Sequence, residues 1–178
     1  MVDAKQPSAI PAIIRPTVAQ VFSWLEEVSD PEIPVLSIID LGIVREVLWR
    51  DDELIVAITP TYSGCPAMVV IEQEIGKALA LRGLCKMRLE RRLSPAWTTD
   101  WLSVKGRLQL REYGIAPPTE KVIDITGISR ARRVEPSVSC PRCGSAHTKL
   151  TSQFGSTACK ALYVCVDCQE PFDYFKPH

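Results

Sequence analysis

Apolar residues repeat at helical spacing in several stretches of this chain and alternate with polar residues in others. The first helical stretch opens at Thr17, which has the form of a capping box with Gln20, and prolines from Pro31 onward are predicted to stop it. A second helix is predicted over 66–82, with proline in its first turn and Gly83 just past its end. Two amphipathic helices are therefore expected in this part of the chain.

The segments beside these helices have the pattern of strands. Segments 43–50 and 54–59 are rich in β-branched residues and are joined by a short acidic turn, which predicts a hairpin. Segment 85–91 alternates apolar and charged residues, which predicts a third strand.

A last helix is predicted to begin at Thr98 or Thr99 and to end near Gly114. Its predicted apolar face consists of Trp101, Val104 and Leu108. The order helix, two strands, helix, strand, helix predicts an α+β fold in which helices pack on a small mixed sheet.

Five of the seven cysteines lie beyond this region, toward the end of the chain. Two C-x-x-C knuckles, Cys140 with Cys143 and Cys165 with Cys168, predict a four-thiolate metal site closed by a hairpin. Zinc is the expected metal, although similar knuckles in rubredoxin leave iron chemically open. The fifth sulfur, Cys159, is an alternative ligand, a redox-active thiol or a small strand residue.

These patterns divide the chain into four predicted parts. Residues 1–16 form a flexible arm and 17–116 the α+β domain, while 117–137 form a connector and 138–178 a β-rich zinc ribbon. The 178 residues are long enough for one domain of ordinary size and a small one.

Composition and charge narrow the functional classes. The chain is 46% hydrophobic and 24% charged, and 21 basic residues balance 21 acidic ones, which argues against a nucleic-acid or anionic-membrane surface. No export signal or membrane span is recognisable, and an odd number of cysteines in knuckles points to a reducing cytoplasm. A nucleic-acid-binding ribbon remains a third alternative, and it would use Arg130, Arg132, Arg133, Lys149 and Lys160.

Cys65 is the candidate functional thiol outside the ribbon. It directly precedes the helix predicted over 66–82, where unpaired N–H groups and the helix dipole favour an anion. A thiol at this place is expected to have a lowered pKa. The alternative is a small buried residue at a strand-to-helix junction. The loop before it offers the supporting residues Thr59, Thr61, Ser63 and Gly64.

Three carboxylates, Asp30, Glu32 and Asp40, precede the hairpin. They are predicted either to end a helix and stabilise turns or, if their loop faces Cys65, to tune a metal or contact a partner. Cys85 lies on the apolar side of the predicted third strand and is expected to fill the core.

The two histidines, His147 and His178, both lie in the predicted ribbon, so neither is an expected base for Cys65. No glycine-rich phosphate loop or serine nucleophile motif is present. A thiolate without a base suits redox exchange or metal ligation, and the chain is not expected to catalyse a reaction of its own.

Several motifs resemble known families. Segments 30–35 (DPEIPV), 40–44 (DLGIV) and 59–66 (TPTYSGCP) resemble the iron–sulfur assembly domain family that includes SufT. Further segments resemble the PaaD family of bacterial phenylacetate catabolism, namely 97–101, 111–117, 140–145, 154–160 and 170–172.

This resemblance covers nearly the whole chain beyond the arm. It implies an accessory role beside the multicomponent oxygenase that converts phenylacetyl-CoA to its ring epoxide. It also implies that Cys65 is the family's functional cysteine and that the ribbon ligands are Cys140, Cys143, Cys165 and Cys168.

The leading hypothesis is a maturation factor that holds or passes iron or an iron–sulfur cluster transiently through Cys65. Its expected partner is the iron–sulfur reductase component of the epoxidase, with no nucleic acid and no membrane. Stable clusters usually take four ligands, so a second thiol is expected from another subunit, as in a homodimer, from a partner or from exogenous thiols. The alternative is a non-catalytic structural subunit of the epoxidase that docks through its ribbon.

Overall fold

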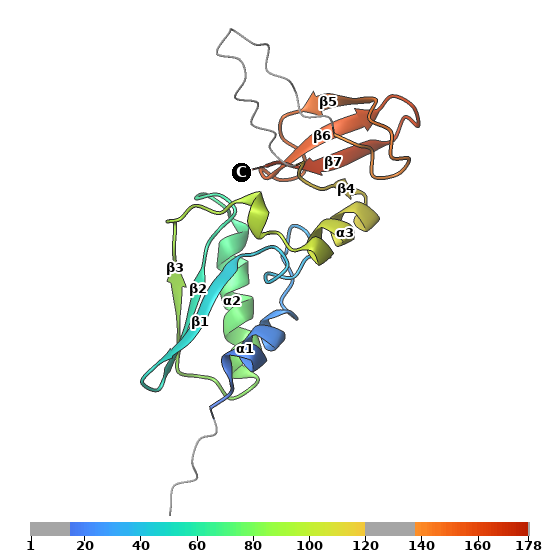
Figure 1. Ribbon diagram of the computed structural model, residues 1–178. Helices are drawn as coiled ribbons and strands as arrows, with labels where there is room; N and C mark the ends of the chain where they lie inside the picture. Colours follow the sequence, from blue (N-terminus) through green and yellow to red (C-terminus); the bar gives the residue numbers. More distant parts are fainter. Residues whose placement is uncertain (1–14, 120–137, 178) are drawn as a thin grey trace, which may run out of the picture.

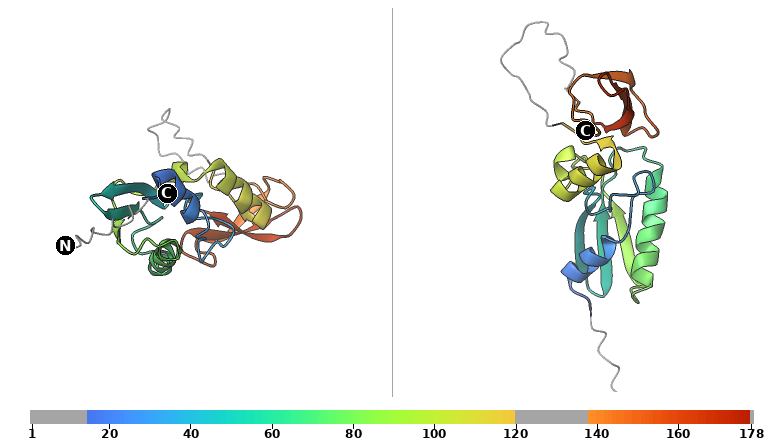
Figure 2. Two further views of the ribbon diagram at one scale, coloured as in Figure 1. Left: turned by 90° about the horizontal axis from the view of Figure 1, so that it is seen from below. Right: turned by 90° about the vertical axis from the view of Figure 1, so that its right-hand side faces the viewer.

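The computed structural model describes residues 15–119 and 138–177. The predicted arm falls almost entirely outside these residues, as does most of the predicted connector, and the domain boundaries stay predictions. Figures 1 and 2 show a mixed α/β part and a β-rich part, which lies at the end opposite the β1–β2 turn. Within the two described ranges, no helix is long and apolar enough to cross a membrane.

The first sheet contains β1 (Val44–Arg50), β2 (Glu53–Ile58) and β3 (Met87–Arg91), with β2 in the centre. β1 and β2 form the predicted antiparallel hairpin, and Asp51 in its turn has a φ of 53°. β3 is parallel to β2, so α2 (Ala67–Ala80) forms the crossover between them. The predicted α+β fold with a small mixed sheet is confirmed.

The helix α1 (Val18–Leu25) begins at the predicted capping box. The backbone N–H of Gln20 donates to the Thr17 hydroxyl at 3.2 Å, and the N–H of Thr17 donates to Gln20 Oε1 at 2.8 Å. These two bonds satisfy donors that the first turn of a helix leaves free.

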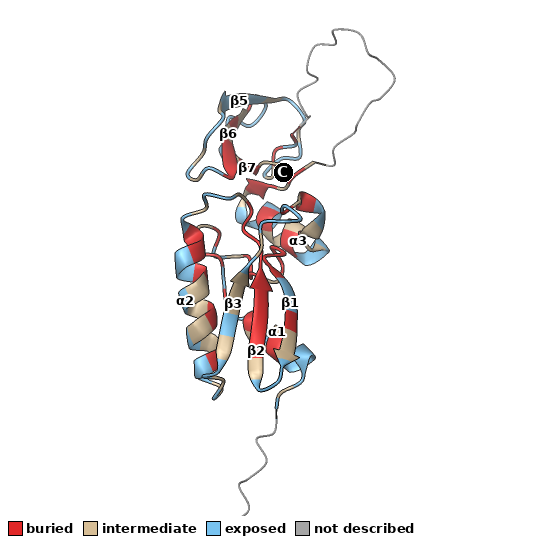
Figure 3. Ribbon diagram, turned by 90° about the vertical axis from the view of Figure 1, so that its left-hand side faces the viewer, coloured by how far each residue is buried: buried red, intermediate tan, exposed pale blue. Residues whose placement is uncertain are grey.

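Figure 3 shows β2 buried along most of its length between its neighbours.

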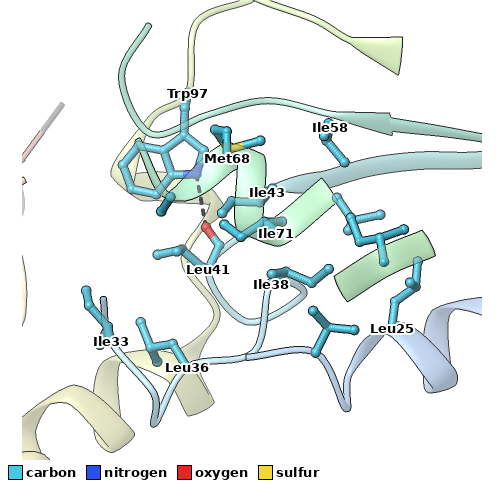
Figure 4. Packing of buried hydrophobic residues seen from close by; sticks show 14 of the residues in the cluster. Leu25, Ile33, Leu36, Ile38, Leu41, Ile43, Ile58, Met68, Ile71 and Trp97 are labelled. Atoms are coloured by element: carbon cyan, nitrogen blue, oxygen red, sulfur yellow. Dashed lines mark hydrogen bonds between the residues drawn. The ribbon is translucent and has the colours of Figure 1, made fainter. Parts of the chain in front are cut away.

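The main core is formed by the sheet, the two helices and the long loop 31–43 that joins α1 to β1. Trp97 closes this core, because its Nε1–H donates to the carbonyl of Leu41 at 2.9 Å (Figure 4). Figure 4 shows residues of this loop packed against both helices and the sheet. The core residues labelled there include Leu25, Ile33, Leu36, Ile38, Ile43, Ile58, Met68 and Ile71.

The last helical segment of this part differs from the prediction. A short 3₁₀ turn, η1 (Thr99–Trp101), comes first, and α3 (Val104–Tyr113) then starts at the N-cap Ser103. Val104 and Leu108 are exposed, so the predicted apolar face was wrong. The cause is the separate cap at Ser103, which restarts the helix in a different rotation from one that begins at Thr98 or Thr99.

Gly106 and Leu110 are the residues that α3 buries. A Cβ at Gly106 would lie 3.2 Å from both the carbonyl oxygen of Asp40 and the Leu102 side chain. In contrast, a Cβ at Gly76 inside α2 would meet nothing within 4 Å. Gly106 therefore allows α3 to pack closely against Asp40 and Leu102, whereas no neighbouring group among the described residues packs against α2 at Gly76.

We expect Gly76→Ala to raise the free energy of unfolding by about 0.5–1 kcal/mol, because alanine has the higher helix propensity. Gly106→Ala should lower it by about 1 kcal/mol, because overpacking against a fixed backbone outweighs that gain. Urea denaturation at constant m measures both changes. Equal gains from the two substitutions would contradict the packing role of Gly106.

The second sheet has the order β4-β7-β6-β5. It contains β4 (Ile115–Ala116), β5 (Thr148–Ser152), β6 (Lys160–Cys165) and β7 (Pro171–Phe175). β5, β6 and β7 form an antiparallel ribbon, whereas β4 comes from the other side of the connector and pairs with β7 in parallel. The β-rich ribbon is thus present, and it takes one short strand from the chain that follows α3.

The two parts also share a core. Phe175 of β7 is fully buried among the residues of the main core, where Cys159 lies as well. The Phe175 ring packs edge-on against Trp97, with ring centroids 6.0 Å apart and an interplanar angle of 63°. The ribbon is therefore docked on the α/β part through buried side chains.

Candidate functional site

The four knuckle cysteines come together in the ribbon. The Sγ atoms of Cys140, Cys143, Cys165 and Cys168 all lie within 4.8 Å of one another. Sγ of Cys140 is 3.7 Å from that of Cys168, and Sγ of Cys143 is 3.5 Å from that of Cys165. A tetrahedral zinc ion with Zn–S bonds of about 2.3 Å requires sulfurs about 3.8 Å apart. The four thiols therefore have the spacing of a metal site.

The two knuckles have the same backbone geometry. In the first, the N–H of Gly144 donates to the carbonyl of Cys140 at 2.9 Å; in the second, the N–H of Gln169 donates to the carbonyl of Cys165 at 3.0 Å. Gly144 and Gln169 are also the residues that reach positive φ, at 76° and 63°. Glycine adopts this conformation freely and glutamine rarely does. The sequence alone therefore indicates the positive φ in the first knuckle, at Gly144, but not in the second, at Gln169.

Backbone N–H groups point at the sulfurs of these knuckles. The N–H of Ser145 faces Cys143 Sγ and the N–H of Glu170 faces Cys168 Sγ. The N–H of Cys168 lowers the pKa of Cys165 to about 7. Such donors stabilise thiolates, while the mutual repulsion of four thiolates requires a cation among them. The chemistry of this donor set thus fits a divalent metal.

Cys65 lies where the sequence placed it, directly before α2. The N-cap of α2 is Pro66, so the helix begins at Ala67, one residue later than predicted. The Cys65 thiol is half-buried, and the N–H of Met68 donates to the Cys65 carbonyl at 3.4 Å. The N–H groups of Ala67 and Met68, in the first turn of α2, also act to lower the pKa of the thiol.

The predicted lowering of the Cys65 pKa was wrong. Burial raises the pKa of this thiol above its ordinary value, the N–H groups of Ala67 and Met68 oppose that rise, and Glu32 and Asp30 add to it. Two neighbouring carboxylates disfavour a thiolate, and local sequence around the cysteine does not reveal them. At neutral pH Cys65 is consequently a protonated thiol.

Two of the three predicted carboxylates lie beside Cys65. Asp30 is buried, and its Oδ1 accepts the N–H groups of Glu32 at 2.8 Å and Ile33 at 2.9 Å. Burial raises the pKa of Asp30 despite these bonds. Burial and the charge of Asp30 also raise the pKa of Glu32. The loop that ends the first helix thus places two carboxyl groups with raised pKa values near the thiol.

Asp40, the third carboxylate, has a different environment. It accepts hydrogen bonds from the Ser37 hydroxyl at 2.9 Å and the Ser103 hydroxyl at 2.7 Å, and Lys105 Nζ lies 3.0 Å away. Burial alone would raise the pKa of Asp40, but the bonds from Ser103, Lys105 and Ser37 outweigh it and lower the pKa. Asp40 therefore fixes the start of α3.

The loop 59–64 forms one wall of an open pocket of about 360 Å³. Thr59 and Thr61 are buried, whereas Ser63 and Gly64 are exposed. The opposite wall comes from the segment after β3, which contributes Leu93, Ala96 and Trp97. Of the predicted supporting residues, Thr59, Thr61 and Ser63 therefore line this pocket, which ends two residues before Cys65 in the chain.

Cys159 is the residue that the sequence left without a role. It lies outside the four-cysteine group and is only 4% exposed. Its Sγ is 3.1 Å from the hydroxyl of Thr157 and 4.0 Å from Glu32 Oε2 in the other part of the chain. Burial raises the pKa of Cys159, Thr157 lowers it and Glu32 raises it further. No spacing motif marks this contact, because its partners are 127 residues apart.

Two other predicted residues have different positions from those expected. Cys85 is exposed, so its predicted core position was wrong; β3 begins only at Met87, and Cys85 belongs to the preceding turn. Lys160 is buried, with Nζ 3.3 Å from Asp173 Oδ2, and is not available to a nucleic acid. The basic cluster 130–133 lies outside the described residues.

The chain combines an iron–sulfur assembly domain with a zinc ribbon. The family model "Iron-sulfur cluster assembly protein" matches residues 18–85, and the model "PaaD zinc beta ribbon domain" matches residues 126–176. The first match includes Cys65, and the second includes the four knuckle cysteines.

A protein of Escherichia coli (strain K12), provisionally named as a component of 1,2-phenylacetyl-CoA epoxidase, is 48% identical over 164 residues, which cover 92% of this chain and 95% of that protein. The chain therefore belongs to the PaaD family.

Two further proteins are similar to the first part alone. The "Fe-S protein maturation auxiliary factor YitW" of Bacillus subtilis (strain 168) is 36% identical over 88 residues, which are 48% of this chain and 85% of that protein. A crystal structure of a domain of unknown function from Bacillus anthracis covers 52% of this chain and 89% of its own, with a TM-score of 0.49 and 24% identity.

Proposed function

We propose that this protein is an iron–sulfur maturation factor that supports a phenylacetyl-CoA epoxidase by holding or passing iron, or a cluster, through Cys65. The observation that carries the proposal is a half-buried thiol at the start of α2, with two carboxylates beside it, inside the match to the assembly-protein model. The names of the Escherichia coli and Bacillus subtilis relatives supply the epoxidase and the maturation role. The target is the epoxidase's iron–sulfur reductase component, in the cytoplasm.

The environment of Cys65 suits transient binding. A thiol that keeps its proton at neutral pH binds a metal only by releasing that proton, so protons compete with the ion and weaken its binding. Too few ligands surround Cys65 for a stable cluster, which usually takes four. A weakly held ion or cluster passes readily to an acceptor that offers more thiolates.

The ribbon has a different role in this proposal. Cys140, Cys143, Cys165 and Cys168 would hold zinc, which supplies folding free energy to a small sheet. With four protein ligands the coordination sphere is closed and has no position for a substrate. In this proposal the ribbon therefore holds the adjacent segments of the α/β part in place and presents a surface to the epoxidase.

Replacement of Cys65 by serine tests the function. When the epoxidase components are co-produced with the Cys65→Ser protein, we expect the reductase to be isolated with most of its iron–sulfur absorbance and iron missing. Anaerobically purified Cys65→Ser should retain its zinc but lack any iron-linked absorption band. Cys85→Ser is the matched control, because it makes the same chemical change at an exposed thiol.

The alternative function, a non-catalytic structural subunit, predicts another result. If the reductase from the Cys65→Ser strain carries its full cluster and the assembled epoxidase is still inactive, the maturation role is excluded. The same measurement with the whole protein deleted shows whether the reductase depends on it at all.

A further inference from the structure

We propose that Cys159 is the second thiol of the Cys65 site, so that the ribbon and the assembly domain together bind one ferrous ion. This inference rests on the proposed function and gives it a ligand set: Cys65 and Cys159 as thiolates, with Glu32 as the carboxylate between the two parts of the chain. The second thiol then comes from the same chain, and a homodimer is not needed to supply it.

The position of Cys159 carries the proposal. Its sulfur is 4.0 Å from Glu32 Oε2, a separation at which one metal ion can contact both groups after a small adjustment. It is buried within the main core, and Cys65 packs against that same core from the assembly domain.

The ribbon backbone fixes this position. The N–H of Lys176 donates to the carbonyl of Cys159 at 3.0 Å, and the N–H of Lys160 donates to the carbonyl of Thr157 at 3.1 Å. Beside this pair, Phe175 is anchored against Trp97 of the first part. The start of β6 is therefore held at the domain junction by the same contacts that dock the ribbon.

Tyr62 links the two thiols. Its pKa is raised to about 12 by burial, and the nearby Cys65, Glu32 and Cys159 all add to that rise. The Cys65 side chain is also a hydrogen-bonding partner of Tyr62. The Tyr62 hydroxyl therefore lies near enough to both sulfurs and to Glu32 for their charges to act on it.

The charge of this cluster favours a cation. Asp30, Glu32, Cys65 and Cys159 all hold their protons more tightly than usual, mainly because they are buried. Lys160 acts to lower the pKa values of Asp30, Glu32 and Cys159, and it is itself paired with Asp173. A divalent ion that replaces protons would relieve this crowding of acids, and thiolates select a soft ion such as iron over magnesium or calcium.

Binding changes no oxidation state. The ion arrives as Fe²⁺, each thiol releases one proton to water as its sulfur bonds to the metal, and departure of Fe²⁺ reverses both steps. Among the described residues, only the ribbon's four cysteines already have three or more ligand atoms within 4.8 Å of one another. An ion between Cys65 and Cys159 must therefore draw their side chains together, which suits a site that releases what it binds.

Anaerobic titration of the zinc-loaded, full-length protein with ferrous ammonium sulfate tests the site. Loss of even an outer partner of a metal ligand costs about 10- to 100-fold in affinity, so Cys159→Ser should weaken Fe²⁺ binding at least about tenfold. Cys65→Ser should do the same, each variant should lose part of the sulfur-to-iron charge-transfer band, and Cys85→Ser should change nothing. Zinc content and thermal unfolding measure whether each variant is folded. Cys159→Ala is a second replacement at the same position and should weaken Fe²⁺ binding as Cys159→Ser does.

The outcomes separate the two proposals. If Cys65→Ser weakens binding and Cys159→Ser does not, the shared site is wrong while the maturation function stands. If only Cys159→Ser weakens binding, the shared site is also wrong. If the wild type binds no Fe²⁺ beyond its ribbon metal, the shared site is wrong, and the cluster content of the reductase from the Cys65→Ser strain decides the maturation function.

Discussion

Replacement of Cys140 by serine is expected to abolish metal binding by the four cysteines, for which we propose zinc, and to unfold the ribbon. Cys140 is fully buried, and its sulfur lies 3.7 Å from that of Cys168 in the four-cysteine group. Zinc binding to small zinc-finger peptides contributes about 10–16 kcal/mol at pH 7. A whole domain is stable by only about 5–15 kcal/mol, so a four-stranded sheet of this size cannot replace that contribution.

The measurement is zinc content by metal analysis together with near-ultraviolet circular dichroism, which reports the packed rings of Tyr163, Phe172 and Tyr174. A strong chelator should have the same effect on the wild type, and added zinc should reverse it. Cys85→Ser, at an exposed thiol, should retain zinc and the aromatic signal. A Cys140→Ser protein with full zinc and an unchanged melting temperature would show that the quartet does not stabilise the ribbon.

Phe175→Ala is expected to lower the free energy of unfolding by about 3–5 kcal/mol, as large-to-small replacements of buried aromatics do. Phe175 is 0% exposed and lies at the junction, where its ring meets Trp97. The cavity would open between the ribbon and the first part, so both should become less stable. Zinc binding should be retained, because Phe175 belongs to the main core, whereas Cys140 and Cys165 belong to the separate core of the ribbon.

Phe154→Ala is the matched control for this prediction. Its ring is 66% exposed and has Lys176 Nζ 4.5 Å from its centroid, so its loss should cost no more than about 1 kcal/mol. Urea denaturation followed by tryptophan fluorescence gives both values. Equal losses in the two variants would mean that the ribbon is not docked through Phe175.

Local signals in the sequence predicted most of the elements correctly. The capping box at Thr17, the hairpin turn at Asp51 and the helix after Pro66 each depend on residues a few positions apart, so they can be read from a single stretch of chain. The mixed sheet followed from the order of these elements. The spacing of the knuckles likewise indicated a metal site, because both turns are local.

The errors concern contacts between distant segments. Asp40 binds Ser103 across 63 positions, and this contact sets the face of α3 that the periodicity of α3 alone misassigned. The pKa of Cys65 depends on carboxylates some thirty residues upstream, which oppose the effect of the helix start. The contact between Cys159 and Glu32 joins two domains, and no pattern within either domain indicates it.

The strand β4 has a consequence for how the two parts are tethered. Only two residues long, it pairs with β7 before the chain enters the connector, so backbone hydrogen bonds hold the ribbon beside α3. The connector therefore keeps the ribbon at a high effective concentration relative to the first part, but it does not determine the distance between the two parts. Lengthening it would leave the contact between Cys159 and Glu32 unchanged, because strand pairing and the ring of Phe175 hold the junction at which that contact lies.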